Sequence, residues 1–542
     1  MATIEISKKE LETLLGKKLS LEIIKERIEM LGLPIENVED DKILVEVFPN
    51  RPDLLSQYGI ARALRSFIGT KKGLSTYQTK KSGVKVIVDN NLKGIRPFTA
   101  CCIVKNLNFD DEKIRDIIQF QEKLHVTMCR NRKKGAIGIY PLEKIKFPIH
   151  FKAMPKEEIK FTPLGFGAGM SASEILEDTD QGKQYGYLLS EFKQYPVFLD
   201  SENNILSMPP ILNSELVGKI TPKTKDVFIE VSGYDLEFLK KVLNIIITNM
   251  VEMKGQIYSL DVIYSGKSSQ FPDLSPRKMK ININYINKLL GLSLKENEIK
   301  LYLEKMGFSY SKGTVLIPPY RADILHEIDL MEEIAISYGY EKFTPILESF
   351  YSIAEESKFE TFKDKIASLL SGLEFLEVNM PHLTNKINLN EKMNFNSEFM
   401  GLKNALSEEF NILRSWLTPG LMEVISNNKH NEYPQKIFEI GTIFGKEEKI
   451  RMACLTTHSK ANFTEIKQVL DSILNSLELK YEIKDTEHPS FIPGRAGRIS
   501  VKGKEIAYLG EISPESLEKW SLEQPAAALE LNLTDLFDIL KL

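Results

Sequence analysis

The segment 318–340, PPYRADILHEIDLMEEIAISYGY, places several carboxylates on a stretch with the apolar spacing of a helix. Apolar residues recur at intervals of three and four, which predicts one buried stripe formed by Leu325, Ile328, Met331, Ala335 and Tyr338. Asp329, Glu332 and Glu333 follow the spacing i, i+3 and i+4 and share a neighbouring face, while Asp323 lies at the start of the helix. Three like charges on one turn repel one another unless a cation lies between them.

Mg²⁺ would suit this face, because a hard cation prefers oxygen ligands and keeps several waters. In the alternative interpretation, Asp323 caps the helix and the other three carboxylates form a solvated face. The motif HEIDL is not that of a zinc protease, since Leu330 stands where the second histidine belongs. Spacing alone leaves both interpretations of the carboxylates open.

The length of 542 residues predicts three or four domains, each able to bury a core. The net charge of −4 neither indicates nor excludes a nucleic-acid partner. The four cysteines form no CxxC pair, which favours reduced, buried thiols and a cytoplasmic protein. The first residues are too charged for a signal peptide, and the apolar run VLNIIITNMV is too short and too polar to cross a membrane.

The elements expected along the chain predict an α+β protein of four parts. Residues 1–75 read as an α/β module, in which two helices begin at a serine and end at a glycine, followed by a strand, a turn and a third helix. A polar linker is expected at 71–83, and residues 84–265 mix strands with helices. Residues 278–345 predict a helical, winged-helix-like module, and residues 350–542 predict an antiparallel sheet with flanking helices.

The segment 318–340 closely resembles part of the β subunit of phenylalanyl-tRNA synthetase, in its archaeal and eukaryotic cytosolic form. Other segments agree in the same order and span nearly the whole length. NRPDLLSQYGIARAL resembles the N-terminal signature of the family, and both QEKLHVTMCRNRKKGAIGIY and NNILSMPPILNSE resemble its editing domain. The synthetase-like core is matched by SEEFNILRSWLTPGLMEVISNNKHNEYPQKIFEIG and HPSFIPGRAGRI.

The resemblance implies a ligase subunit that works in a heterotetramer of two α and two β subunits. The α subunit would carry the class II active site, bind ATP and L-phenylalanine, and attach phenylalanine to tRNA(Phe). The β subunit would supply a scaffold, tRNA contacts and Mg²⁺ binding, with no membrane association. Carried over by position, the implied Mg²⁺ ligands are Asp323, Asp329, Glu332 and Glu333.

The C-terminal part is expected to be a degenerate class II core without synthetic activity. A class II synthetase needs an arginine on a strand to bind the α-phosphate of ATP, and the planar, always charged guanidinium suits this role. FEIG at 438–441 has no arginine at the matching place. We expect Arg414, Arg495 and Arg498 to pair with carboxylates, and the sheet and helices to dock the α subunit.

The family's editing domain would hydrolyse mischarged tyrosyl-tRNA, because an apolar phenylalanine pocket cannot strongly reject one added hydroxyl. The candidates are Asn213, Ser214, Glu215 and Asp235. Glu215 or Asp235 would read the hydroxyl, and Asn213 and Ser214 would orient the water or the carbonyl. The same residues also suit helix caps.

Three positions in this region depart from the family pattern and bear on whether editing is active. Tyr234 stands near a usual threonine, Cys129 at a usual glycine and Pro141 at a usual aspartate.

The run CRNRKKG at 129–135 is a candidate RNA contact. Arg130, Arg132, Lys133 and Lys134 would bind phosphates near the acceptor end of tRNA, and a solvated loop is the alternative. Two other functions remain open for the whole chain. One is a free-standing editing hydrolase, and the other is a non-catalytic assembly or nucleic-acid-binding protein built on a decayed synthetase core.

Overall fold

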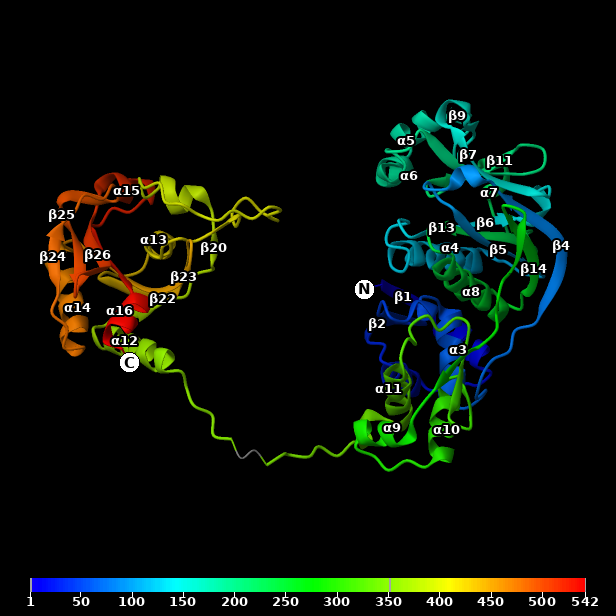
Figure 1. The fold of residues 1–542 in the computed structure, drawn as a ribbon, viewed down its shortest axis with the longest axis horizontal. Helices are drawn as coiled ribbons and strands as arrows, with labels where there is room; N and C mark the ends of the chain where they lie inside the picture. Colours follow the sequence, from blue (N-terminus) through cyan, green and yellow to red (C-terminus); the bar gives the residue numbers. More distant parts are fainter. Residues whose placement is uncertain (1, 350–351, 542) are drawn as a thin grey trace. The chain divides into compact units, whose positions relative to one another are not determined.

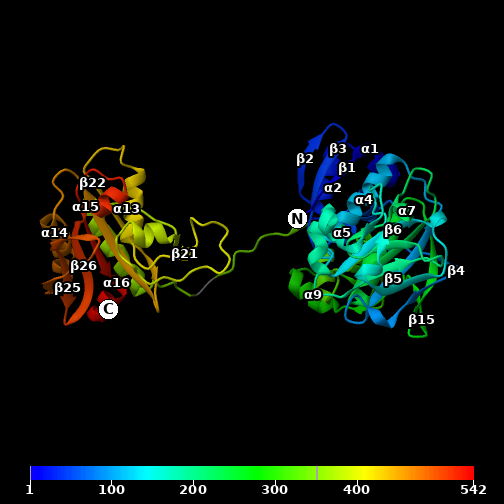
Figure 2. The same cartoon turned by 90° about the horizontal axis from the view of Figure 1, so that it is seen from above.

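The computed structural model describes residues 2–349 and 352–541, which form two compact units, Met1–Ile346 and Leu347–Leu542. Figures 1 and 2 show the fold of each unit in two views. Each unit has its own hydrophobic core. The first unit holds the first three expected domains, and the second holds the synthetase-like part.

A small module with a three-stranded antiparallel sheet opens the first unit. The helices begin as predicted, because the side chains of Ser7 and Ser20 accept hydrogen bonds from the backbone N–H groups of Glu10 and Ile23. The first strand was not predicted from the charged N-terminal stretch. The elements are β1 (Ala2–Ser7), α1 (Lys8–Leu15), α2 (Leu21–Met30), β2 (Ile35–Glu39), β3 (Lys42–Val47), a 3₁₀ turn (Pro52–Leu54) and α3 (Gln57–Phe67), with the strands in the order β1-β3-β2.

A ten-stranded sheet forms the centre of the first unit (Figure 1). The long strand β14 pairs in parallel with β4 and antiparallel with β5, so it joins the two halves of the sheet. The strands are β4 (Thr79–Val88), β5 (Phe98–Lys105), β6 (Gly135–Pro141), β7 (Ile149–Pro155), β10 (Gln194–Leu199), β11 (Ile205–Met208), β12 (Leu212–Asn213), β13 (Val227–Gly233), β14 (Gln256–Tyr264) and β15 (Lys267–Phe271). The spatial order is β12-β11-β10-β7-β4-β14-β5-β13-β6, with β15 beside β14.

The ends of this sheet correct two expected boundaries. β4 begins at Thr79, inside the stretch expected to be a linker, because its polar residues lie on exposed strand positions. β15 continues the sheet to Phe271, beyond the expected end at 265.

Two helices, α4 (Asp111–Val126) and α8 (Leu236–Glu252), pack on the sheet. The apolar run in α8 is buried in the core, and no helix in the described part of the chain has the length and hydropathy to cross a bilayer. Shorter helices, α5 (Ala172–Asp178), α6 (Asp180–Tyr185) and α7 (Glu215–Gly218), accompany the connecting segments. A two-stranded ribbon of β8 (Lys160–Phe161) and β9 (Met170–Ser171) lies between them in sequence.

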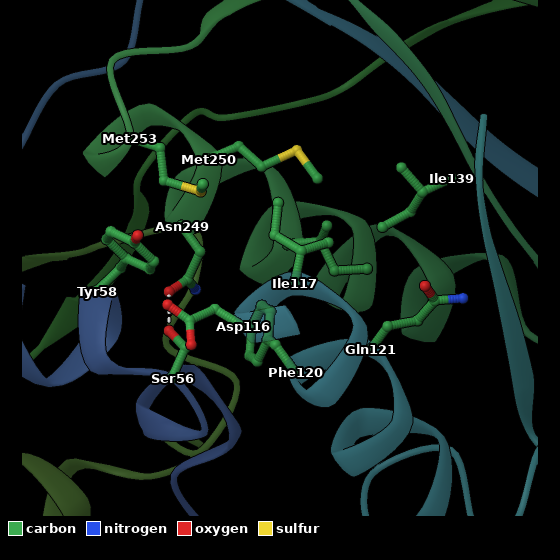
Figure 3. A pocket seen from close by; sticks show the side chains of 11 residues that line it. Ser56, Tyr58, Asp116, Ile117, Phe120, Gln121, Ile139, Asn249, Met250 and Met253 are labelled. Atoms are coloured by element: carbon green, nitrogen blue, oxygen red, sulfur yellow. Dashed lines mark hydrogen bonds between the residues drawn. The ribbon is translucent and has the colours of Figure 1, made fainter. Parts of the chain in front are cut away.

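The N-terminal module joins the sheet domain through a narrow seam (Figure 3). Ser56 and Asn249 are joined by a hydrogen bond, and the side-chain amide of Gln57 donates to Asp116 Oδ2 at 2.6 Å. Burial raises the pKa of Asp116 to about 6. The seam encloses only about 10 Å³, which is room for at most one water, so it is a packing joint and not a ligand site.

The last domain of the first unit is winged-helix-like, as expected. Its elements are β16 (Arg277–Lys280), α9 (Ile283–Leu290), α10 (Glu296–Lys305), β17 (Ser309–Ser311), β18 (Thr314–Ile317) and α11 (Glu327–Tyr338), and its strands follow the order β16-β18-β17. Leu330, Met331 and Ile334 of α11 are buried in the small core of this domain. Met331 and Ala335 of the expected stripe are buried, but Leu325 and Ile328 are 70% and 45% exposed. The buried face of the helix is therefore rotated from the predicted one and includes Leu330 and Ile334.

A seven-stranded sheet with helices on both faces makes up the second unit. All of its strands pair antiparallel except β19 with β22, in agreement with the expected antiparallel core. The strand order is β19 (Leu376–Glu377), β22 (Gln435–Phe444), β23 (Glu448–Thr457), β27 (Ala526–Asn532), β26 (Lys504–Ile512), β25 (Phe491–Val501) and β24 (Glu482–Asp485). One face is covered by α12 (Lys358–Gly372), α14 (Phe463–Ser476) and α16 (Leu533–Leu540), and the other by α13 (Thr418–Asn427) and the segment around α15 (Pro514–Lys519).

Candidate functional sites

A cleft of 670 Å³ opens in the sheet domain and has the size of an ordinary ligand pocket. Its walls come from α4, β6, α6 and the segment 207–213. Among the residues that line it are Glu122, His125, Arg132, Ser207, Asn213 and Glu230. The cleft therefore combines an apolar body with a few converging polar groups.

Glu230 is the unusual group in this cleft, because it is a carboxylate in the middle of the buried strand β13. Only 2% of the residue is exposed, and the hydroxyl of Tyr140 donates to its Oε1 at 3.2 Å. Burial raises the pKa of Glu230 to about 8, so the side chain is mostly protonated at neutral pH. Its second oxygen, Oε2, has no hydrogen-bond partner among the described residues.

The space around Glu230 depends on a glycine in the neighbouring strand. Gly138 lies directly across from Glu230 in β6. A Cβ atom at position 138 would lie 2.2 Å from the Tyr140 hydroxyl and 2.6 Å from Glu230 Oε1. Ser207 adds a second buried oxygen that has no partner in the described structure. Buried polar atoms without partners are uncommon, and a ligand that enters the cleft would satisfy them.

His125 also lines the cleft, but its two ring nitrogens are already engaged. Nε2 accepts the backbone N–H of Ile137 at 2.8 Å, so the proton resides on Nδ1, which lies 3.2 Å from Glu122 Oε1. Burial lowers the pKa of His125 and favours the neutral ring. This histidine holds the wall of the cleft and has no free nitrogen to act as a base.

The four candidate editing residues do not meet at one point. Asn213 lines the cleft and its Oδ1 lies 3.4 Å from the Tyr140 hydroxyl. Ser214 caps α7, and Glu215 accepts the backbone N–H of Gly165 at 2.7 Å.

Asp235 caps α8, where its carboxylate accepts the N–H groups of Glu237 and Phe238. The capping interpretation is therefore confirmed for Ser214 and Asp235, and Asn213 is the one candidate that lines this cleft. The sequence signal for Glu230 was the acidic residue inside the apolar run VFIEVSG, which was not used.

The basic run is divided between two surfaces. Arg130, Lys133 and Lys134 are exposed. Arg132 is buried, because Nη1 donates to the backbone carbonyls of Pro210 and Ile211, and Nη2 donates to Glu122. Arg132 therefore holds the wall of the first cleft and does not offer its guanidinium to a phosphate. This position corrects the expectation that all four residues contact RNA.

Lys133 and Lys134 line a second cleft, of 530 Å³, together with Arg96, Tyr187, Tyr234 and Asp235. Arg132 lines the first cleft, whereas its neighbours Lys133 and Lys134 line the second. In the same way, Tyr185 lines the first cleft and Tyr187 lines the second.

The acidic helix α11 uses its carboxylates in two different ways. Asp323 and Glu333 both bind Arg321, at 2.7 Å and 2.6 Å from Nη2. This guanidinium is buried and supplies the cation that the like charges require. Arg51 of the N-terminal signature also approaches, with Nη1 3.9 Å from Glu333 Oε1.

The other two carboxylates lie elsewhere on the helix. Asp329 Oδ2 accepts the N–H groups of Leu325 and His326, and Glu332 accepts the hydroxyl of Tyr340 at 2.8 Å. In the ranges 2–349 and 352–541, no three His, Cys, Asp or Glu side chains are grouped as a metal ion requires. As arranged here, the four carboxylates do not form a Mg²⁺ site, and Mg²⁺ binding by this face stays a prediction.

The three C-terminal arginines pair with carboxylates, which confirms the structural interpretation. The pairs, with their nitrogen–oxygen distances, are Arg414–Glu439 at 2.6 Å, Arg495–Glu511 at 2.5 Å and Arg498–Glu505 at 3.0 Å. A nearby cleft lined by Arg414 and Trp416 has a volume of only 90 Å³, well below the ~300 Å³ of small-molecule pockets. Arg414 is buried in its pair, whereas Arg495 and Arg498 pair at the surface.

Comparison with known proteins decides the family. A family model described as the phenylalanyl tRNA synthetase beta chain CLM domain matches residues 348–533, and a tRNA synthetase B5 domain model matches residues 279–340. The phenylalanine–tRNA ligase beta subunit of Pyrococcus abyssi is 40% identical over 555 residues, which cover 99% of this chain and 100% of that one. The chain belongs to the phenylalanine–tRNA ligase β-subunit family.

Other members agree with this membership. The β subunit of Archaeoglobus fulgidus is 39% identical over 538 residues, covering 98% of this chain and 97% of that one. An N-terminal fragment of the phenylalanyl-tRNA synthetase β subunit from Pyrococcus horikoshii shares the fold, with a TM-score of 0.60 and 40% identity over 62% of this chain and 99% of the fragment. As a phenylalanine–tRNA ligase β chain, the protein is a subunit of an aminoacyl-tRNA synthetase.

Proposed function

We propose that this chain works with an α subunit, in a complex of two α and two β subunits, to attach L-phenylalanine to tRNA(Phe). The α subunit binds ATP and L-phenylalanine and carries out synthesis, and this chain is a scaffold and tRNA ligand. The paired arginines and the small 90 Å³ cleft of the C-terminal unit support this division of labour. The family relationship and the chemistry of the chain favour a cytoplasmic enzyme.

We further propose that the 670 Å³ cleft hydrolyses mischarged tyrosyl-tRNA. One observation carries this proposal: Glu230 Oε2 and Ser207 Oγ are buried oxygens without partners in a cleft large enough for an aminoacyl group. A phenol hydroxyl can both donate to and accept from a protonated carboxyl group, whereas a phenylalanine ring would leave both oxygens unpaired. The resulting discrimination follows from the cost of an unpaired buried polar group.

Within this proposal, Glu230 reads the tyrosine hydroxyl, and Asn213 orients the ester or the attacking water at the mouth of the cleft. Ser214, Glu215 and Asp235 shape the surrounding backbone through the hydrogen bonds described above. Arg130, Lys133 and Lys134 attract the phosphates of tRNA, and Arg132 holds the wall. Of the proposed Mg²⁺ ligands, Asp329 and Glu332 lie outside the arginine pairs, and a full four-carboxylate site requires those pairs to open.

The test uses the chain co-expressed with an α subunit from the same organism. We expect phenylalanine charging by the complex and by neither chain alone. We also expect the complex to deacylate tyrosyl-tRNA(Phe), and Glu230→Leu to slow this step at least tenfold while charging is unchanged. Glu157→Gln, an exposed change in the same domain that does not line the cleft, is the matched control. Association without charging would refute the subunit assignment, and wild-type complex that leaves tyrosyl-tRNA intact would refute editing.

Deacylation by this chain alone, without association with an α subunit, would favour the free-standing hydrolase. If neither charging nor deacylation is observed, the chain is a non-catalytic assembly or nucleic-acid-binding protein.

A further inference from the structure

The second cleft, of 530 Å³, contains a buried cation that forms no ion pair in the described part of the chain. Arg96 lines this cleft and is only 2% exposed. Its Nε and Nη2 donate to the side chain and carbonyl of Ser232, at 3.0 Å and 2.6 Å, and Nη1 donates to no group in the described structure. No carboxylate forms an ion pair with it among these residues. A buried, unpaired guanidinium is costly, and an anion bound in the cleft would balance its charge.

Two lysines add to the positive charge of this cleft. Lys133 and Lys134 are exposed and line it next to Arg96. The carboxylates present do not neutralise them: Asp235 is committed to the N-terminus of α8, and Glu191 lies exposed on the lining. The cleft therefore offers three cations to a ligand of negative charge.

Exposed aromatic rings stand beside these cations. Tyr187 is 60% exposed and Tyr234 is 45% exposed, and both line the cleft. The guanidinium carbon of Arg96 lies 5.9 Å from the centre of the Tyr234 ring, so the cation and the stacking face are adjacent. Basic groups that follow a backbone, together with aromatic faces that stack bases, are the elements by which proteins bind single-stranded nucleic acid.

The backbone of the basic run is shaped to build both clefts at once. Arg130, Asn131 and Arg132 have φ angles of 50°, 52° and 64°, a left-handed conformation that is uncommon in non-glycine residues. This turn directs Arg132 inward to the first cleft and leaves Lys133 and Lys134 at the second. The two clefts are therefore lined by consecutive residues of one turn.

We propose that the cleft formed by Arg96, Lys133, Lys134, Tyr187 and Tyr234 binds the unpaired 3′ end of tRNA. Arg96 and the lysines hold phosphodiester groups, and one base stacks on Tyr234. The inference rests on the editing function proposed above, because the terminal nucleotide carries the aminoacyl ester into the 670 Å³ cleft. It also accounts for Tyr234, which departs from the family pattern: the bulky ring is a stacking surface at the entrance and not a member of the hydrolytic site.

The test measures binding of a fluorescent RNA oligonucleotide that ends in CCA to the full-length chain at several salt concentrations. We expect Tyr234→Ala to weaken binding roughly tenfold, the effect of losing one stacked base, and Tyr234→Phe to bind as the wild type does. Lys133→Gln with Lys134→Gln should lower the slope of log affinity against log salt by about 1.4. Lys80→Gln with Lys81→Gln, an adjacent exposed pair that lines neither cleft, is the matched control.

Three outcomes would overturn the inference: no binding by the wild type, equal binding by Tyr234→Ala, or an effect of the control pair as large as that of Lys133 and Lys134. AMP provides the other source of a phosphate and a base. If AMP competes at the same concentration as the oligonucleotide, the cleft is a mononucleotide site and the RNA assignment fails. Deacylation of tyrosyl-tRNA is measured in parallel. RNA binding that depends on the second cleft, without deacylation, would refute the editing function alone. Deacylation that is insensitive to Tyr234→Ala would refute only the role of the second cleft.

Discussion

Arg321 and Glu333 face each other in a buried, two-point ion pair, with Nη1 3.0 Å from Oε2 and Nη2 2.6 Å from Oε1. The same guanidinium also binds both oxygens of Asp323. Two of the four carboxylates expected to hold Mg²⁺ thus hold a side chain of their own domain. This ion pair holds the loop 318–326 against α11. Arg51 of the N-terminal module also approaches Glu333.

The buried pair predicts a large loss of stability when one partner is removed. Glu333→Gln leaves a buried guanidinium short of a counterion, so we expect the free energy of unfolding to fall by about 3 kcal/mol. Glu332→Gln, on the exposed face, should change it by less than about 0.5 kcal/mol. Urea unfolding followed by circular dichroism measures both variants, because both tryptophans, Trp416 and Trp520, lie in the other unit and do not report on this one. Equal stability of the two variants would show that the ion pair contributes little.

The Mg²⁺ prediction is tested separately by calorimetric titration of the full-length chain and of its complex with the α subunit. The change of Asp329 and Glu333 to Asn and Gln together should abolish Mg²⁺ binding if the four-carboxylate site forms. The prediction fails if Mg²⁺ neither shifts the urea midpoint of the wild type nor gives a heat of binding. Arg321 would then be the only cation that balances these carboxylates in the described structure. Glu341→Gln, on the exposed turn after the helix, is the control.

Glu230 predicts a pH dependence of stability with a defined sign. Its pKa rises from an ordinary 4.5 to about 8 on burial, so the folded state holds one more proton than the unfolded state between these values. Its contribution to the free energy of unfolding therefore falls as pH rises from 4.5 to 8, by an amount on the order of 5 kcal/mol, and is constant above that range. Glu230→Gln should remove this slope. An unchanged slope in urea titrations from pH 5 to 9 would contradict the raised pKa.

Asp116 in the N-terminal seam predicts a smaller effect of the same sign. Its pKa is raised from 3.8 to about 6, so stability is lost as pH rises through that window. Asp116→Asn keeps an acceptor for Gln57 and removes the buried charge, so we expect a gain of about 1 kcal/mol at pH 7.5, after allowance for solvent screening. At pH 4 the two proteins should unfold alike. A loss of stability at pH 7.5 would mean that the carboxylate is needed in its charged form.

The C-terminal unit predicts a chain that is inactive in the first step of synthesis. We expect no phenylalanine-dependent ATP–pyrophosphate exchange by this chain alone. Arg495→Ala should leave the kcat and KM for ATP of the complex within a factor of two, since Arg495 pairs with Glu511 and holds no nucleotide. Lys480→Ala, an exposed change in the same unit, serves as the comparison. A rise in the KM for ATP in Arg495→Ala but not in Lys480→Ala would indicate that Arg495 contacts the nucleotide.

The elements of the fold were largely predictable because local rules act over a few residues. Serines before α1 and α2 specify the starts of these helices within a single turn. The apolar spacing around α11 predicts a helix, but its buried face was predicted only in part, because Leu325 and Ile328 are exposed. The strand β1 was missed although Ile4 and Ile6 alternate with polar residues, which is the pattern of a half-buried strand. The linker was predicted too long because β4 begins with polar residues that neighbouring strands hold in place.

The sites were less predictable because they depend on residues that are distant in sequence. Arg321 stands two positions from Asp323, yet only the folded loop shows that it also binds Glu333. Arg132 belongs to a basic run by sequence, but the left-handed turn directs it to the carbonyls of residues 210 and 211. Glu230 was visible as a lone acid in an apolar strand. A pocket around it requires Gly138 on another strand to leave the space empty.

The position of β14 in the large sheet has a consequence for how the chain is made. β4 and β5 leave the ribosome early, but each needs β14 as a neighbour, and a long stretch of chain separates them. Until residue 264 has emerged, both strands present unpaired backbone groups that can recruit other nascent chains. We expect slow translation between β5 and β14 to prolong this interval and to lower the yield of folded chain.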